Sequence, residues 1–192
     1  TLANPQNVYE RVVNGVADIG WAVHGALGVP FPKTSVTNLP FEVGDAITGS
    51  IALWNLYESG VIADEYRDIV PLALVAPPPS GLHAKKRVAT LADMKGLKVR
   101  AADRISAELV TALGGTPISV PAPETYQSLS RGVVSAAVMP WSGVTTFKLQ
   151  EVSEHHLDVP LGSIPGMVFI GKKTFEKLPA AAQAAIKAES GL

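Results

Sequence analysis

The spacing of hydrophobic residues divides this chain into alternating helical and extended segments. Helices are predicted at 8–14, 46–59, 91–96, 105–113, 123–132 and 143–155. Strands are predicted at 16–23, 68–76, 97–101, 116–120 and 133–139, with Gly- and Pro-rich breakers at 25–32 and 77–81. Strands that alternate with helices of this length predict an α/β protein with parallel sheets.

A short unit of sequence occurs twice. Tyr9 stands six residues before Gly15, which precedes one predicted strand, and Tyr126 stands six residues before Gly132, which precedes another. Each glycine follows a predicted helix, where a left-handed backbone conformation is common. Two copies of a helix, a glycine and a strand predict two similarly built lobes.

The two ends of the sequence do not match this repeating plan. Thr1 stands just before the first helix, without a strand for that helix to pack against, and 180–191 is an alanine-rich helix on its own. We therefore expect that terminal elements of the fold are missing at both ends. No signal peptide opens the sequence, so in an exported protein that signal would belong to the precursor.

Composition narrows the class of protein mainly by exclusion. The 192 residues carry 16 basic and 17 acidic side chains, a net charge of −1, which gives no reason to expect a nucleic acid or an anionic membrane as partner. The chain contains no cysteine, so disulfides, thiolate metal sites and cysteine nucleophiles are excluded. The longest apolar stretch, 69–79, contains Pro71 and Pro77 and is too short to span a bilayer.

Motifs for catalysis are absent from the sequence. There is no Gly-x-Ser-x-Gly turn, no P-loop and no Gly-x-Gly-x-x-Gly after a strand, so no cofactor is expected. Glu151 and His155 stand four residues apart on one predicted helix and would suit a metal, although solvated charges are the commoner reason for such a pair. A binding protein is therefore favoured, and the alternative is a carboxylate-processing hydrolase or lyase that uses His24 or His83.

Several motifs occur in one order across nearly the whole chain, and together they resemble a known family. The resemblance is to the solute-binding proteins of TRAP (tripartite ATP-independent periplasmic) transporters, of the dicarboxylate type. The motifs are Leu91–Arg100, Asn14–Gly20, Leu39–Phe41, Gly114–Pro117 with Pro121–Tyr126, and Leu129–Val134 with Phe147–Val152.

The resemblance implies a two-lobed periplasmic-binding-protein-like fold of type II, with a ligand cleft between the lobes. On that basis lobe one is 1–78 plus 166–192, and lobe two is 79–165. It also implies a periplasmic protein that captures a small organic carboxylate and delivers it to the membrane subunits of a TRAP transporter. We expect a monomer that binds neither a metal nor nucleic acid.

Arg100 is the first candidate for contact with the ligand. It stands at the carboxyl end of a predicted parallel strand, where open α/β sheets place their ligands, and its guanidinium can bind a carboxylate through two hydrogen bonds. The arginine at this motif position holds the solute carboxylate in the family that the chain resembles. The alternative is an arginine in a salt bridge at the surface. Asp103, three residues later, is expected to be a helix N-cap.

The other candidates end predicted strands or follow breakers, and most of them are apolar. Core packing is the alternative for the indole of Trp141, and a structural hydrogen bond is the alternative for both histidines. Because the apolar members favour a weakly polar solute, aromatic carboxylates such as hydroxybenzoates are expected first, and 2-oxo acids or dicarboxylates second. The candidates are Trp21, Val23, His24, His83, Ala122, Met139 and Trp141.

Overall fold

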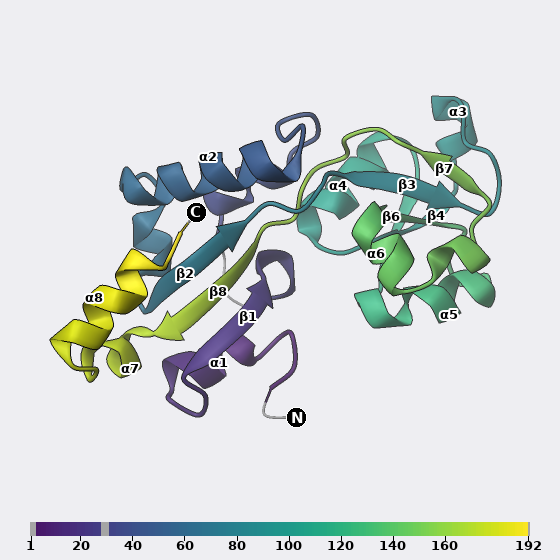
Figure 1. Cartoon of the computed structure of the whole chain (residues 1–192). Helices are drawn as coiled ribbons and strands as arrows, with labels where there is room; N and C mark the ends of the chain where they lie inside the picture. The colour runs from purple at the N-terminus through teal and green to yellow at the C-terminus, as the bar shows by residue number, and fades with distance from the viewer. Residues whose placement is uncertain (1–2, 28–30, 192) are drawn as a thin grey trace. The chain divides into compact units, whose positions relative to one another are not determined.

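The computed structural model describes residues 3–27 and 31–191, drawn in Figure 1. The chain divides into two compact units, of which unit 1 contains 1–37, 45–77 and 164–192, and unit 2 contains 38–44 and 78–163. Within the described residues, no helix combines the length and the hydrophobicity that crossing a bilayer requires. Each unit has its own sheet and its own buried core.

Unit 1 is built on a three-stranded antiparallel sheet in the order β1-β8-β2. The strands are β1 (Ile19–Val23), β2 (Ile69–Val75) and β8 (Gly166–Gly171). The helices are α1 (Val8–Val13), α2 (Ala46–Glu58), α7 (Lys172–Glu176) and α8 (Ala180–Ala188). Single 3-10 turns cover His24–Ala26, Thr34–Asn38 and Ala63–Tyr66.

The core of unit 1 is rich in aromatic rings. Tyr9 packs edge-on against Phe31 with ring centroids 5.9 Å apart, and Tyr66 lies 5.3 Å from the same ring. Leu53 and Phe169 are completely buried beside them. Such rings bury a large area each, so a small sheet with few helices can still hold a stable core.

Unit 2 is built on a mixed five-stranded sheet in the order β5-β4-β6-β3-β7. Strand β4 runs parallel to β5 and β6, whereas β3 is antiparallel to β6 and β7. The strands are β3 (Ser80–Ala84), β4 (Lys98–Ala101), β5 (Thr116–Ser119), β6 (Ala136–Pro140) and β7 (His155–Leu157). The helices are α3 (Leu91–Met94), α4 (Arg104–Ala112), α5 (Thr125–Ser130) and α6 (Trp141–Thr146), with 3-10 turns at Ala122–Glu124 and Leu149–Glu151.

The sheet of unit 2 is buried on both faces. Along β6, Ala136 and Val138 belong to one hydrophobic cluster, and Ala137 and Met139 belong to another. Because successive side chains of a strand point to opposite faces, these two clusters lie on the two sides of the sheet. Helices α3 and α4 contribute to the first cluster, and α5 and α6 to the second.

The repeated helix–glycine–strand unit is confirmed. Gly15 and Gly132 both follow a helix with positive φ, at 72° and 75°. The Val16 N–H donates to the Arg11 carbonyl, and the Val134 N–H donates to the Ser128 carbonyl. These bonds close the last turn of α1 and of α5, which is the reason that a residue without a Cβ is favoured at each glycine.

The prediction of parallel sheets was only partly right. Parallel pairing joins β4 to β5 and β6, but every pairing among the described strands of unit 1 is antiparallel. The Pro-rich breaker ends earlier than expected, since Ser80 and Gly81 already pair with β6. Two expected strands are shorter than predicted, because the chain turns after Gly15 and Gly132 and pairs only from Ile19 and Ala136.

The prediction of one long helix over 143–155 was wrong. Helix α6 ends at Thr146, and Lys148 adopts a left-handed conformation with φ 55°, which no continuous α-helix contains. The chain then makes a 3-10 turn and forms β7. Val144 and Leu149 still enter one buried cluster, which explains why their spacing resembled that of a helix.

Residues 38–44 belong to unit 2, whereas the sequence placed them in the first lobe. Two hydrogen bonds account for this: the Phe41 N–H donates to the Pro160 carbonyl at 3.0 Å, and the Asn38 amide donates to Asp103. That the two units correspond to the two lobes of the resembled family stays a prediction.

Candidate functional site

Arg100 lies near the carboxyl ends of β4 and β5, whereas the parallel strand β6 continues past it to Pro140. It is the third residue of β4, the central strand of the β5-β4-β6 group, and the whole residue is only 4% exposed. The loops that follow β4, β5 and β6 begin at this same edge. In open α/β sheets this edge is the usual place for a ligand.

Backbone carbonyl groups of the neighbouring strands orient the guanidinium group. Arg100 Nε donates to the carbonyl of Val120, which follows β5, and Nη1 donates to the carbonyl of Val138 in β6, both at 3.0 Å. Neutral carbonyls satisfy two of the five N–H groups without neutralising the charge. One hydrogen on Nη1 and both on Nη2 therefore remain for another acceptor.

No carboxylate among residues 3–27 and 31–191 lies within ion-pair distance of Arg100. In the same part of the chain, every fully buried side-chain nitrogen has a hydrogen-bond partner. Nη2 of Arg100 has no such partner, so this nitrogen cannot be fully buried. The guanidinium therefore reaches the surface at Nη2. Burial lowers the pKa of Arg100 to about 10, and the charge of Asp103 opposes that shift. The group is still cationic at neutral pH, so an oriented, uncompensated positive charge lies at this edge. An isolated buried charge is costly and is normally paired.

Asp103 is the expected N-cap of α4. Its Oδ1 accepts from the Ser106 N–H and from Ser106 Oγ, both at 2.8 Å, and Ser106 Oγ in turn accepts from the Asp103 N–H. Its Oδ2 accepts from the amide of Asn38, which is 4% exposed. The local spacing predicted the cap, but no sequence signal connects Asn38 to a residue 65 positions away.

His83 is a buried polar residue on the second face of the sheet, and its partner His156 is exposed. The side chain is fully buried, its Nε2 lies 2.8 Å from the Met139 carbonyl, and its Nδ1 lies 2.9 Å from Nδ1 of His156. Burial lowers the pKa of His83. Both ring nitrogens are occupied, which fits the structural alternative for this residue.

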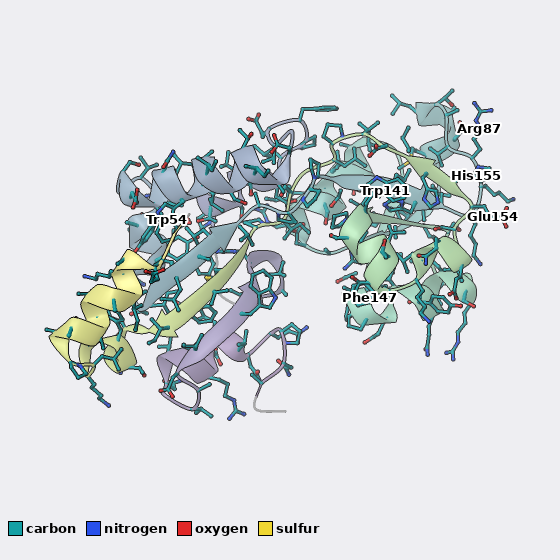
Figure 2. The ribbon with its side chains drawn as sticks, viewed as in Figure 1. Trp54, Arg87, Trp141, Phe147, Glu154 and His155 are labelled. Atoms are coloured by element: carbon teal, nitrogen blue, oxygen red, sulfur yellow. The ribbon has the colours of Figure 1, made fainter. Side chains whose placement is uncertain are left out.

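Trp141 covers this histidine pair. Its ring centroid lies 4.9 Å from that of His83 and 5.0 Å from that of His156, and its Nε1 donates to Asp158 at 3.0 Å. Trp141 is nevertheless 40% exposed, and Figure 2 shows it at the start of α6. It thus offers an aromatic surface three residues after Val138, whose carbonyl holds Arg100.

Met139 and Ala122 lie in the hydrophobic interior of unit 2. Met139 is 3% exposed and packs in the cluster that contains Val120 and Leu129, and half-buried Ala122 packs against the same cluster. The position that a Cβ of Gly143 would occupy is 2.7 Å from the Met139 sulfur, so the helix after β6 approaches this thioether closely. Met139 therefore packs in the core, while its carbonyl orients His83.

The candidates of unit 1 fall into two kinds. Trp21 and Val23 project from the outward-facing positions of β1, with 56% and 37% of their surfaces exposed. His24 is buried, and its ring nitrogens lie 3.0 Å from the Pro165 carbonyl and from the Tyr66 hydroxyl. A hydrogen bond from His24 to a solute would require one of these bonds to break, so its contacts favour the structural alternative.

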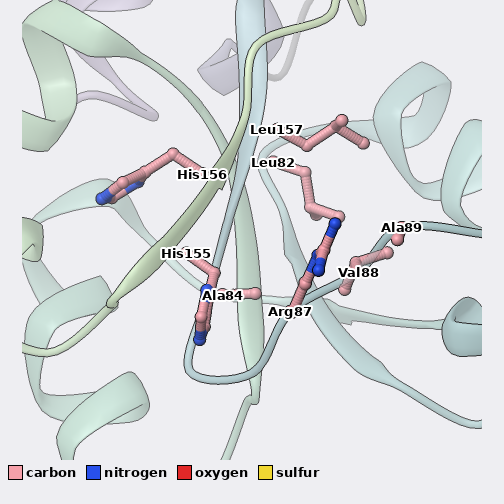
Figure 3. Close-up of a pocket in the computed structure, with 8 residues that line it drawn as sticks. All are labelled: Leu82, Ala84, Arg87, Val88, Ala89, His155, His156 and Leu157. Atoms are coloured by element: carbon pink, nitrogen blue, oxygen red, sulfur yellow. The ribbon is translucent and has the colours of Figure 1, made fainter.

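A separate cavity of about 340 Å³ opens on the first face of the unit 2 sheet (Figure 3). Leu82, Leu157, Arg87 and His155 are among the residues that line it. Arg87 and His155 are both exposed. None of the side chains that line this cavity is both polar and buried, so we do not take it as the candidate site.

The metal-ligand arrangement weighed for Glu151 and His155 does not form. These residues lie on a 3-10 turn and on β7 rather than on one helix, and Glu151 accepts a hydrogen bond from Tyr126. Over the described ranges there is no group of three potential ligands placed to hold a metal ion.

Comparison with known proteins identifies the family. Residues 1–191 match the family model described as bacterial extracellular solute-binding protein, family 7. The chain belongs to this family. The predicted resemblance to the TRAP solute-binding proteins is thereby confirmed. The expectation that the protein lies outside the cytoplasm is also confirmed, since solved members are described as periplasmic.

Three solved TRAP solute-binding proteins resemble the chain closely, and each covers 98% of it. One, from a marine metagenome and described as specific for aromatic acid ligands, contains 3-hydroxybenzoate and is 30% identical with a TM-score of 0.90. One from Rhodoferax ferrireducens contains copurified benzoate and is 31% identical with a TM-score of 0.90. One from Bordetella bronchiseptica contains (R)- and (S)-mandelate and is 30% identical with a TM-score of 0.88.

A curated relative from Comamonas testosteroni, described as the outer membrane transporter protein TsaT, is 28% identical over 196 residues, which cover all of this chain. The chain spans 58% of that relative's length and 60–61% of the length of the three solved proteins. The similarity confirms the two-lobed α/β binding-protein fold. The family model and the three solved proteins are described as solute-binding proteins, which favours a binding protein over the enzyme alternative.

Proposed function

We propose that this chain belongs to a receptor that captures an aromatic monocarboxylate through Arg100. The observation that carries the proposal is an oriented guanidinium without a carboxylate partner within ion-pair distance in the described part of the chain. A planar cation of this kind binds a carboxylate through two parallel, charge-assisted hydrogen bonds. The unused hydrogens on Nη1 and Nη2 provide that pair of donors.

An aromatic ligand is supported by two independent observations. Trp141 exposes part of its indole ring three residues after Val138, which holds the guanidinium. Three solved relatives of 30–31% identity contain 3-hydroxybenzoate, benzoate or mandelate, and each of these molecules has one aromatic ring and one carboxylate. Aliphatic 2-oxo acids and dicarboxylates are the second choice.

The complete protein would release its ligand to the membrane subunits of a TRAP transporter, as the family relationship indicates. It would act as a monomer and bind no nucleic acid. For unit 1, the exposed Trp21 and Val23 are retained as candidate ligand contacts, while the buried positions of His24, His83 and Met139 give them supporting roles. Ala122 lies two residues after Val120, whose carbonyl holds Arg100, and this small residue is retained as a candidate ligand contact.

Isothermal titration calorimetry tests the proposal directly. The ligands are benzoate, 3-hydroxybenzoate and mandelate, compared with succinate and pyruvate. We expect at least one aromatic acid to bind more tightly than the aliphatic acids, and Arg100→Ala to weaken that binding by about 100-fold or more. Arg100→Lys keeps the charge but loses the planar fork, so it should bind about tenfold more weakly than the wild type.

Arg104→Ala is the matched control. Arg104 is four residues further along, exposed, and paired with Glu108 at 2.7 Å, so its removal should leave the affinity unchanged. If the wild-type chain unfolds cooperatively but binds no carboxylate, or if Arg100→Ala binds as well as the wild type, the proposal is wrong.

A further inference from the structure

A second charge lies close to the candidate site and is not neutralised. The Asp103 carboxylate is half-buried, three residues after Arg100, and no cation lies within ion-pair distance of it among residues 3–27 and 31–191. The adjacent cation, Arg104, is paired with Glu108 instead. The negative charge of Asp103 nevertheless stabilises the charged guanidinium of Arg100, so it opposes the lowering of the Arg100 pKa by burial.

The hydrogen bonds of Asp103 explain why it does not neutralise Arg100 itself. The Ser106 N–H and hydroxyl hold Oδ1, and the Asn38 amide holds Oδ2. Asn38 and Ser106 are 4% and 3% exposed, so these bonds are sheltered from water. Both carboxylate oxygens are thus directed to neutral donors, and the guanidinium is left for an external anion.

We propose that Asp103, fixed by Asn38 and Ser106, is a specificity-determining residue that makes the Arg100 site select monoanionic ligands. A single carboxylate neutralises Arg100. A second negative charge on the same ligand would meet the fixed Asp103 carboxylate and would gain no cation in return, and like charges repel. The inference rests on the proposed function, since it describes the selectivity of the same site.

The test compares benzoate with isophthalate, which adds one carboxylate to the same ring. The variant is Asp103→Asn, since asparagine is also a good N-cap and the Asn38 amide can turn its oxygen toward the new donor. We expect the wild type to prefer benzoate, and Asp103→Asn to raise the affinity for isophthalate relative to that for benzoate by about tenfold. Glu154→Gln makes the same change of charge at an exposed carboxylate of unit 2 and should leave this ratio unchanged.

A second variant tests the role of Asn38. In Asn38→Ala, Oδ2 of Asp103 loses its donor and is free to turn toward Arg100, so benzoate should bind several-fold more weakly. The double variant Asn38→Ala/Asp103→Asn should recover the benzoate affinity, because no carboxylate then competes. A general loss of folding would not be recovered by removing a charge.

The outcomes separate this inference from the proposed function. If benzoate binding depends on Arg100 but the ratio in Asp103→Asn equals that in Glu154→Gln, the selectivity is overturned and the function stands. If the double variant does not recover binding that Asn38→Ala has lost, the role assigned to Asn38 is overturned. If neither ligand binds the wild type, both the function and the inference are overturned.

Discussion

The Nδ1 atoms of His83 and His156 lie 2.9 Å apart, so one imidazole donates a hydrogen bond to the other. The Met139 carbonyl, 2.8 Å from Nε2 of His83, can only accept, which places the hydrogen of neutral His83 on Nε2. His83 Nδ1 is then an acceptor, and His156 Nδ1 must donate. This pair joins the short strand β7 to the fully buried strand β3 through side chains as well as through the backbone.

Removing His156 should therefore destabilise unit 2. In His156→Ala the buried Nδ1 of His83 loses its donor, so we expect the free energy of unfolding to fall by about 1–3 kcal/mol. His155→Ala is the matched control, because His155 is exposed like His156 on the same strand but is not the histidine that contacts His83, and its loss should change stability by less than about 0.5 kcal/mol. Urea unfolding of the three proteins measures both effects, and equal losses in the two variants would contradict the assigned bond.

The buried His24 should make the protein less stable in mild acid. Its pKa is lowered to about 4, chiefly by burial, whereas an unfolded histidine titrates near its usual value of 6.5. Below about pH 6.5 His24 binds a proton in the unfolded chain but stays neutral in the folded chain until the pH nears 4, so the free energy of unfolding falls as the pH falls. Between pH 7 and pH 5 this one residue accounts for a loss of about 2 kcal/mol.

Unfolding in urea at pH 7 and pH 5 measures that loss, and His24→Gln supplies the comparison. The variant is expected to be less stable at pH 7, since it changes two buried hydrogen bonds, but to lose about 2 kcal/mol less between the two pH values. An unchanged pH dependence in His24→Gln would show that another group is responsible. His83, whose pKa is also lowered by burial, contributes in the same direction and remains in both proteins.

The two helix-ending glycines should be equally sensitive to replacement. Gly15 and Gly132 have positive φ and no heavy atom within 4 Å of an added Cβ, so alanine meets backbone strain alone. We expect Gly15→Ala and Gly132→Ala each to lower the free energy of unfolding by about 1–2 kcal/mol. Gly44→Ala is the control, because Gly44 has equal space but no positive φ, and it should be neutral or gain about 0.4–1 kcal/mol. Thermal unfolding distinguishes the two cases, and a loss at Gly44 as large as at Gly15 would refute the explanation by strain.

The sequence predicted features that depend on near neighbours. The Asp103 cap, the glycine ends of α1 and α5, and the position of Arg100 in a parallel strand all follow from residues a few positions apart. Their physical causes are a short side chain that reaches the first turn, a missing Cβ, and the edge at which parallel strands end.

Features that depend on distant contacts could not be predicted in this way. His83 meets His156 from 73 positions away, and Asn38 meets Asp103 from 65 positions away. Met139 is a candidate ligand contact in sequence because it stands near the end of a strand, but no local pattern predicts that β6 is central and buried on both faces, so that the Met139 side chain packs in the core. The predicted long helix is interrupted at Lys148, which has a left-handed backbone conformation. Lysine rarely adopts that conformation, so the residue type gives no indication that a helix ends there.

Replacing Arg100 by an apolar residue should abolish ligand binding without lowering stability. Its buried charge lacks a carboxylate partner within ion-pair distance in the described part of the chain, and replacing such a charge by an apolar side chain of similar length removes a desolvation cost. We expect Arg100→Met to abolish carboxylate binding while the free energy of unfolding stays equal to that of the wild type or rises by about 1 kcal/mol. Urea unfolding and calorimetry on one preparation measure the two quantities together. A loss of stability above about 2 kcal/mol would instead show that Arg100 acts mainly by joining β4 to the carbonyls of Val120 and Val138, and the proposal that it binds an external anion would then lose its physical basis.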